Sequence, residues 1–344
     1  MKAAIVTAPG EICIREVPEP VIGHYDALCE VLAVGVCSGT DNHIVAGKHY
    51  RMVPFPLILG HEGIGRVIAC GKRVRYLKDG DLVTRVFNKL PKGSGYAIKY
   101  GAFAERAVAT DWRAMQADGL PEKEWRPYTV HRVLPKNTDP VAATMIITWR
   151  ETYSFLSRMK PQKKERMLLI GSGTQALSFA EHGKNLGLAV SVIGNPGRKK
   201  LFAKVGVKTF ISYKQKNIGA ILQKRGELFD IIIDTVGRSN GANAVLPLLK
   251  HGGKIGVYGL DDFWNYKIEV AKPRGDFSYF TGRQYDEGSA HDAVMKYIKQ
   301  KKLNAWNYLS KKHIYPLAEI KTALLAAHER KVMKSVIVFR RYSY

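Results

Sequence analysis

The stretch ERMLLIGSGTQALSFA, residues 165–180, decides the fold, because an apolar run, two glycines and a helical segment follow one another in it. The pattern Gly171-x-Gly173-x-x-Ala176 lies where a dinucleotide-binding turn is expected. Gly171 allows a tight turn, Gly173 lets the backbone approach a pyrophosphate, and Ala176 permits close packing of helix on strand. An ordinary glycine turn is the alternative. The candidate cofactor-binding residues of this turn are Gly171, Gly173, Thr174, Gln175 and Ala176.

The chain that follows this turn alternates between strand-like and helix-like segments. The strand-like segments are 165–173, 189–195, 208–213, 229–237 and 252–260, and the helix-like ones are 174–187, 196–206, 217–227 and 241–251. Such alternation predicts βαβ units and therefore an α/β domain with a parallel sheet. Because ligands bind at the carboxyl ends of the strands in such sheets, further candidate cofactor-binding residues are Thr235, Val236, Tyr258 and Gly259.

The end of the second strand-like segment indicates the type of cofactor. An acidic residue at this place would hold the ribose 2′-hydroxyl of NAD. The sequence instead has Gly194 and Asn195, followed by the cations Arg198 and Lys199. No carboxylate repels a 2′-phosphate here, and the cations could receive it. The sequence therefore favours NADP(H) over NAD(H), although these cations could also be the solvated start of a helix.

The region before residue 110 has a different character. Short β-like runs are separated by Gly and Pro at 2–8, 13–17, 27–36, 63–70, 81–87 and 103–109. Several short strands at this spacing predict a compact β-rich domain. The tail from Ser289 adds two helical segments and a final strand-like run at 334–339.

A second motif, VGVCSGTDNH at 34–43, follows one of these β-like runs. Cys37 could be a buried small hydrophobe or a metal ligand. Downstream, His61 and Glu62 follow an apolar run and Gly60. Thiolate, imidazole and carboxylate together suit zinc.

These motifs together resemble the zinc-dependent medium-chain dehydrogenases, the group of alcohol, polyol and sugar dehydrogenases. The resemblance rests on VGVCSGTDNH, LGHEGIGRV, DGDLV, GAFAERAV and GSGTQA and covers essentially the whole chain. It implies a GroES-like catalytic domain formed by residues 1–150 and 290–344, and a Rossmann domain at 151–289. It also implies that Cys37 and His61 are catalytic-zinc ligands with Glu62 as a close carboxylate, and that Thr40 and His43 relay the alcohol proton.

The sequence departs from the family pattern at three places. Ser38 is an extra residue between Cys37 and Gly39, so either Cys37 or Ser38 occupies the ligand position. The third ligand position aligns with Ile146 or Ile147, and the nearest carboxylate is Glu151. The four-cysteine structural-zinc loop is absent, so we expect one catalytic zinc and no structural zinc.

Composition and charge restrict the classes of function. The net charge is +24, but the basic residues are dispersed and do not interleave with aromatic residues, which speaks against nucleic acid as a partner. Four cysteines without a CxxC pair argue against a disulfide scaffold. No signal peptide or apolar run long enough for a membrane span is evident, so we expect a cytoplasmic protein.

The sequence therefore predicts an oxidoreductase that interconverts a secondary alcohol, polyol or sugar hydroxyl with its carbonyl. An anionic group on the substrate would account for Lys48 and Arg51, and so would surface exposure. The family is commonly dimeric or tetrameric, and we expect 252–260 to form the sheet edge that pairs in a homodimer or homotetramer. The alternatives are a zinc-free reductase, with Tyr50, Arg51 or Arg150 as the electrophile, and a basic NADP-binding protein without catalysis.

Overall fold

The computed structural model describes residues 1–282 and 286–339, and the chain divides into two compact units. Within the described residues, unit 1 comprises Met1–Arg150, Glu287–Met295 and the segment from Asn304 onward. Unit 2 comprises Glu151–Asp286 and Lys296–Leu303. The long helix α4, Pro140–Arg158, contains the point at which the chain passes from one unit to the other.

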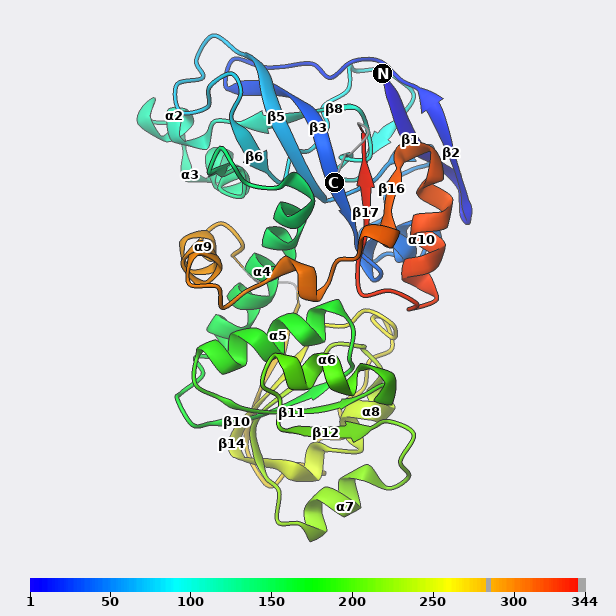
Figure 1. The fold of residues 1–344 in the computed structure, drawn as a ribbon, viewed down its shortest axis with the longest axis vertical. Coiled ribbons are helices and arrows are strands. Elements are labelled where there is room, and N and C mark those ends of the chain that lie inside the picture. Colours follow the sequence, from blue (N-terminus) through cyan, green and yellow to red (C-terminus); the bar gives the residue numbers. More distant parts are fainter. Residues whose placement is uncertain (283–285, 340–344) are drawn as a thin grey trace. The chain divides into compact units, whose positions relative to one another are not determined.

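Unit 2 confirms the α/β prediction, because its described residues form one six-stranded sheet in which every neighbouring pair is parallel. The strand order is β12-β11-β10-β13-β14-β15, so the order reverses between β10 and β13 (Figure 1). Its elements are β10 Arg166–Ile170, α5 Thr174–Asn185, β11 Ala189–Gly194, α6 Lys199–Lys204, β12 Thr209–Ser212, α7 Ile218–Lys224, β13 Phe229–Asp234, α8 Ser239–Asn243, β14 Leu249–Val257 and β15 Phe277–Thr281. Such a reversal opens a crevice at the carboxyl ends of the strands, where ligands of these sheets bind.

Unit 1 is β-rich, as the sequence predicts. Its described strands form a four-stranded sheet, β2-β1-β4-β7, and a seven-stranded one, β16-β17-β3-β5-β6-β9 with β8 paired to β3. The elements are β1 Lys2–Ala8, β2 Glu11–Glu16, β3 Asp26–Val36, α1 Thr40–Val45, β4 Leu57–Ile58, β5 Glu62–Cys70, β6 Leu82–Thr84, β7 Ala97–Ile98, β8 Arg106–Thr110, α2 Trp112–Ala117, α3 Glu122–Trp125, β9 Val133–Leu134, β16 Ile314–Pro316, α10 Ile320–His328 and β17 Ser335–Val338. A further helix, α9 at His291–Lys299, begins in this unit.

Strand β3 is the centre of the larger sheet. It pairs with β5 along most of its length, with β8 at its amino end and with β17 at its carboxyl end, so residues distant in sequence meet there. Its inward side chains, such as Val31 and Val34, are fully buried in the main core of the unit together with Ala323 of α10. None of the helices in the described part of the chain combines the length and the apolar character that a bilayer crossing requires.

The edge-strand prediction was wrong. Strand β14, which contains most of the segment 252–260, lies inside the sheet between β13 and β15. The described edge strands are β12 and β15. The sequence of β15, FSYFT, follows a long polar stretch and was not identified as a strand, so the sixth position of the sheet was missed.

The loop 88–100 takes part in the smaller sheet of unit 1, and Trp149 lies in the interior of the same unit. The loop is partly built into unit 1, because β7 pairs with β4 and Ile98 packs against the cluster around Ile5. Trp149 is 2% exposed and its ring lies edge-on to Tyr308 with ring centroids 5.9 Å apart. It therefore packs in the core of unit 1.

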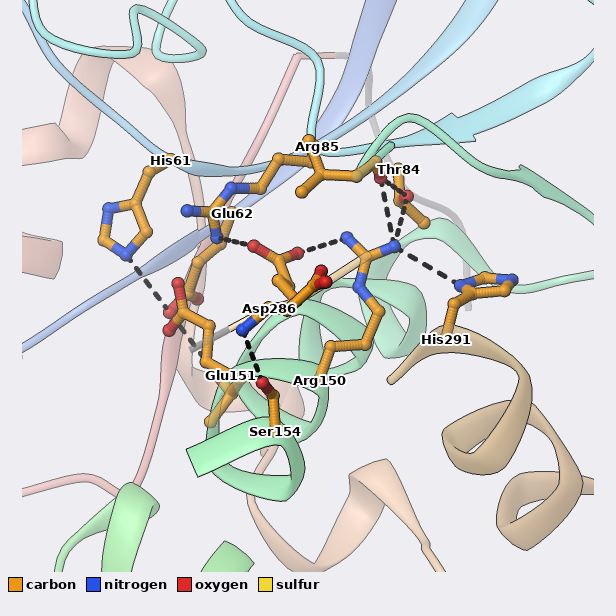
Figure 2. Close-up of polar contacts among 12 residues, drawn as sticks. His61, Glu62, Thr84, Arg85, Arg150, Glu151, Ser154, Asp286 and His291 are labelled. Carbon is orange, nitrogen blue, oxygen red and sulfur yellow. Dashed lines mark hydrogen bonds and ion pairs between the residues drawn. The ribbon is translucent and has the colours of Figure 1, made fainter. Parts of the chain in front are cut away.

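A buried ion-pair network holds unit 1 together around Arg150. The Arg150 side chain is fully buried, pairs with Glu287 and donates to Thr84 Oγ1 at 3.0 Å (Figure 2). The second oxygen of Glu287 accepts from Arg85 at 2.9 Å. Burial and the charge of Arg150 lower the pKa of His291 to about 3, so its neutral ring accepts a hydrogen bond from Arg150 at 3.3 Å. Arg150 is engaged in this network, which does not agree with its alternative assignment as an electrophile.

Replacing Glu287 tests this network. We expect Glu287→Gln to lower the free energy of unfolding by about 3 kcal/mol, because it removes the charge of the buried carboxylate that pairs with both Arg150 and Arg85. The matched control is Asp292→Asn, since Asp292 also pairs with an arginine but its side chain is 82% exposed. This control should cost less than about 1 kcal/mol in chemical denaturation. Equal losses in the two variants would show that the buried pair does not hold the unit together.

Candidate functional site

The register between β3 and β5 brings the sequence-predicted metal ligands together. Gly35 lies opposite Glu62 in the antiparallel pair, so Cys37, just beyond β3, meets His61, just before β5. A side chain at position 35 would collide with the Glu62 carboxylate and lie 2.9 Å from Lys334 Cε. Glycine at this position therefore makes the room in which the carboxylate turns across the end of β3.

The described residues contain a group of side chains that could hold a metal ion, formed by Cys37, His61 and Glu62. One thiol, imidazole or carboxylate atom from each lies within 4.8 Å of the others, and all three side chains are buried. Ser38, by contrast, is exposed. The extra residue is accommodated in the turn that leads into α1, where the Asp41 amide donates to the Cys37 carbonyl at 3.1 Å. The side chain that faces His61 and Glu62 is thus that of Cys37.

Asp41 orients both Cys37 and His61, and the sequence analysis did not single it out. Its side chain is fully buried, and its Oδ2 accepts the Cys37 amide at 2.9 Å. Its Oδ1 lies 3.3 Å from Nδ1 of His61, which leaves Nε2 facing Glu62 at 3.9 Å. Burial opposes a charge on His61, but Asp41 and Cys37 outweigh it and raise its pKa well above the ordinary value. The electrostatic surroundings at this position favour positive charge.

A lysine closes the other side of the donor group. Lys334, just before β17, is 3% exposed and forms an ion pair with Oε2 of Glu62. Burial opposes its charge, but Glu62 and the other acidic neighbours raise the pKa of Lys334 above its ordinary value. Oε1 of Glu62 accepts from Thr148 at 3.3 Å. Glu62 is therefore paired with a buried cation and fixed in orientation.

The donor set fits zinc. Zinc accepts sulfur, nitrogen and oxygen ligands together, and a carboxylate on the far nitrogen of a ligating imidazole is a common second partner. Cys37, His61 and Glu62 could supply the three ligand atoms, with Asp41 behind His61. Glu151, the fourth sequence candidate, is not in this group, and it accepts a hydrogen bond from Tyr258 at 3.4 Å. Ile146 and Ile147 are buried and carry no donor atom.

Thr40 and His43 lie one helical turn apart in α1, directly after the donor turn. Nδ1 of His43 lies 2.7 Å from the carbonyl of Gly39. Because a carbonyl only accepts, Nδ1 carries a proton, and Nε2 is the nitrogen left for another partner. Both side chains are half-buried.

The glycine turn in unit 2 has the geometry of a phosphate cradle. Gly171 has φ +111°, and a side chain there would collide with Thr235. Gly173 caps α5, no heavy atom would lie within 4 Å of an added side chain, and the cap makes no side-chain hydrogen bond. The space at the Cβ position of Gly173 is thus open, as the approach of a pyrophosphate to the start of α5 requires. Thr174 and Ala176 are buried beneath this turn, and Gln175 is half-buried.

Packing explains why no acid follows β11. A side chain at Gly194 would place its Cβ 2.5 Å from Cβ of Ser172, so only glycine fits beside the turn. The Asn195 amide donates to Ser172 Oγ at 2.9 Å, and Arg198 donates to the Ser172 carbonyl at 2.9 Å. Lys199 is exposed. The guanidinium of Arg198 is therefore fixed to the rim of the glycine turn, with no acidic side chain between residues 194 and 199.

The carboxyl ends of β13 and β14 meet beside that turn. The amides of Tyr258 and Gly259 donate to the Asp234 carbonyl at 2.9 and 3.0 Å, and Thr235 donates to the Ile170 carbonyl at 2.8 Å. The Val236 amide is bound by the Asp234 carboxylate at 2.8 Å. The structure therefore brings together the candidate cofactor-binding residues of these two strand ends. The Tyr258 ring itself packs edge-on to Phe155 and Phe179.

Comparison with known proteins identifies relatives along most of the chain. The profile of the alcohol dehydrogenase GroES-like domain matches residues 23–119. An L-threonine 3-dehydrogenase of Streptomyces coelicolor is 31% identical over 275 residues, which cover 73% of this chain and 74% of that protein. D-arabinitol dehydrogenase 1 of Uromyces fabae is 26% identical over 274 residues, 76% of each chain. In fold, an alcohol dehydrogenase of Thermus sp. ATN1 is similar, with a TM-score of 0.78 at 22% identity over 99% of this chain and 100% of that one.

Three residues around the donor group escaped the sequence analysis as functional residues: Asp41, Lys334 and Tyr100. Asp41 lies inside the quoted motif between Thr40 and His43, so its position was a usable signal. Lys334 lies far along the chain from the motif, and Tyr100 lies in a loop. No local sequence pattern marks either residue. Tyr100 contacts His61, with ring centroids 5.3 Å apart.

Zinc binding distinguishes Cys37 from Ser38. We expect Cys37→Ser to weaken zinc binding by at least about 100-fold and Asp41→Asn by about 10-fold, because one removes a ligand atom and the other its orienting partner. Ser38→Ala should leave the affinity unchanged, since its side chain is exposed. Zinc content by elemental analysis and a competition titration with a chelator measure the three variants. Loss of zinc in Ser38→Ala, with Cys37→Ser retaining it, would reverse the assignment.

Proposed function

Because this chain belongs to the medium-chain dehydrogenase/reductase superfamily, in its group of zinc-type alcohol and polyol dehydrogenases, we propose that it is an oxidoreductase acting on a secondary alcohol, polyol or sugar hydroxyl or on the corresponding carbonyl. The observation that carries the proposal is the convergence of Cys37, His61 and Glu62 within 4.8 Å in a buried position. A nicotinamide cofactor, when bound, supplies or accepts the hydride.

The metal would be held by Cys37 and His61, with Glu62 as the third donor. Zinc, when bound, supplies a Lewis acid that polarises a carbonyl or acidifies an alcohol oxygen. Asp41 keeps the proton of His61 on Nδ1, so that Nε2 is available as a ligand. Lys334 pairs with Glu62 and limits how far its carboxylate can turn. These residues preorganise the donor group before any ligand arrives.

Proton transfer would run through Thr40 and His43. The hydrogen bond of His43 Nδ1 to Gly39 leaves Nε2 free to accept a proton during alcohol oxidation and to return it during carbonyl reduction. Thr40 lies one turn before it in α1 and can pass the proton between substrate and imidazole through its hydroxyl. Both residues are half-buried, so the relay would lead from the site toward solvent.

NADP(H) is the proposed cofactor. Its pyrophosphate would bind the amides after Gly173, and Arg198, fixed to the Ser172 carbonyl, supplies a cation for the 2′-phosphate at the end of β11. The packing of Gly194 against Ser172 excludes the acidic side chain that would repel that phosphate.

The activity is tested with purified protein, NADP⁺ and a panel of secondary alcohols and polyols. We expect NADPH formation that is lost on treatment with a strong chelator and restored by zinc. In His43→Gln, kcat should fall about 100-fold with zinc content unchanged, because the proton acceptor is removed while the ligands remain. Activity that withstands complete zinc removal would contradict the metal mechanism. NADPH binding without turnover over the whole panel would instead indicate a binding protein.

Cofactor preference is tested at Arg198. Arg198→Gln should raise KM for NADP⁺ about 10-fold while KM for NAD⁺ changes little, because only NADP⁺ carries the phosphate that the charge would bind. The control is Lys204→Gln, an exposed cation at the far end of α6. An equal rise for both cofactors would show that Arg198 shapes the turn rather than selecting the phosphate.

A further inference from the structure

The ring of Tyr100 lies between the candidate metal centre and a group of cations in unit 1. It contacts the ring of His61 with centroids 5.3 Å apart, and Tyr100 has a left-handed φ of +71°. Nζ of Lys99 lies 5.4 Å from the centroid of the same ring, and the Arg85 guanidinium lies 5.7 Å from it. Positive charge therefore gathers around Tyr100, directly beside His61.

Lys99 and Arg51 differ from Arg85 and Lys334 because no carboxylate among the described residues pairs with them. The Lys99 side chain is half-buried, whereas the Arg51 side chain is exposed. Arg85 pairs with Glu287 and Lys334 pairs with Glu62. Within the described ranges 1–282 and 286–339, by contrast, no ion pair involves Lys99 or Arg51. Burial, and then the charge of Arg51, lowers the pKa of Lys99 below its ordinary value. The half-buried ammonium of Lys99 is thus repelled by Arg51, and no carboxylate in the described part of the chain offsets this repulsion.

His49 shows that this positive charge extends to the candidate catalytic residues. His49 is buried, and burial together with the charge of Lys99 lowers its pKa to about 4, with smaller contributions from His61 and His43. The neutral His49 ring accepts the amide of Arg51 at 3.2 Å, which fixes the backbone of the segment 49–51. The guanidinium of Arg51 lies 5.5 Å from the centroid of the Tyr50 ring. The two unpaired cations thus lie on fixed segments near both the donor group and the proton relay.

A half-buried cation without a counterion costs stability, and such costs persist at places where a ligand supplies the missing charge. The Tyr100 ring contacts both His61 and Lys99, so one aromatic ring separates the Lys99 ammonium from the candidate metal centre. On the basis of the function proposed above, we propose that Lys99 and Arg51 bind an anionic group, a phosphate monoester or a carboxylate, on the alcohol substrate. Two unpaired cations match the charge of about −1.5 to −2 of a phosphate monoester at neutral pH.

The binding test uses three polyols of equal chain length that differ in one end group: D-sorbitol, D-gluconate and D-sorbitol 6-phosphate. Isothermal titration calorimetry with the zinc-loaded protein compares their affinities. We expect an anionic member to bind at least about 10-fold tighter than sorbitol, because charge-assisted hydrogen bonds are added, and its affinity to fall with rising salt. Whichever anion binds more tightly identifies the group as phosphate or carboxylate.

Three variants locate the site. Lys99→Met and Arg51→Gln should each reduce the preference for the anion about 10-fold while leaving the affinity for sorbitol unchanged. The matched control is Lys92→Met, an exposed lysine in the same loop as Lys99, which should retain the full preference. Lys99→Met should also raise the Tm of the ligand-free protein, because it removes a repelled, half-buried charge.

Four results would overturn the inference. The first is equal affinity of the wild-type protein for sorbitol and both anions, and the second is a preference for the anion that survives in Lys99→Met and Arg51→Gln. The third is a loss of this preference in Lys92→Met equal to the loss in Lys99→Met. The fourth is that Lys99→Met and Arg51→Gln weaken NADPH binding, measured by NADPH fluorescence, while the preference for the anionic polyol stays. The failure of the proposed function looks different. A calorimetric preference for the anion that disappears in the variants, without turnover of any alcohol, would retain the anion site and remove the dehydrogenase activity. Turnover of neutral and anionic alcohols with equal kcat/KM would retain the dehydrogenase activity and remove the anion site.

Discussion

The buried ion pair between Glu62 and Lys334 is the interaction on which the candidate site depends. Glu62 begins β5 and Lys334 precedes β17, and these two strands flank the end of β3. Each charge would be expensive in the interior without the other. Because Gly35 has no side chain, the two groups can meet across β3, and the turn that carries Cys37 lies directly beyond them. The sheet pairing and the pairing of charges therefore fix the same arrangement.

The rim of this centre stores conformational strain as well as charge. Arg85 and Tyr100 both have left-handed backbone conformations, with φ +61° and +71°, although neither is glycine. Non-glycine residues in this region are costly and tend to occur at functional sites. Here the strained positions aim a guanidinium and an aromatic ring toward the same place beside His61. The surplus of positive charge around Tyr100 then follows from Lys99 and Arg51, which lack carboxylate partners in the part of the chain that the structure describes.

Much of unit 2 could be predicted from the sequence because its signals are local. The strand, the glycine turn and the helix follow one another between Arg166 and Asn185. Packing against Ser172 explains why residue 194, where an acid could have stood, is glycine. The prediction failed at β14 and β15. The order of strands in a sheet depends on which surfaces pair, and the sequence of β14 is equally compatible with an edge or an interior place. The family resemblance, carried by several weak motifs together, agrees with the relatives found.

The sequence by itself determined the α/β class of unit 2, the glycine turn and the identity of Cys37, His61 and Glu62 as candidate ligands, since each is written in contiguous residues. The tertiary structure alone decided that Cys37 rather than Ser38 faces His61, that Asp41 and Lys334 support the donors, and that Arg150 is committed to Glu287. These contacts join residues as far apart in the sequence as Glu62 and Lys334. They depend on strand register and on the need of each buried charge for a partner, which no local pattern of residues encodes.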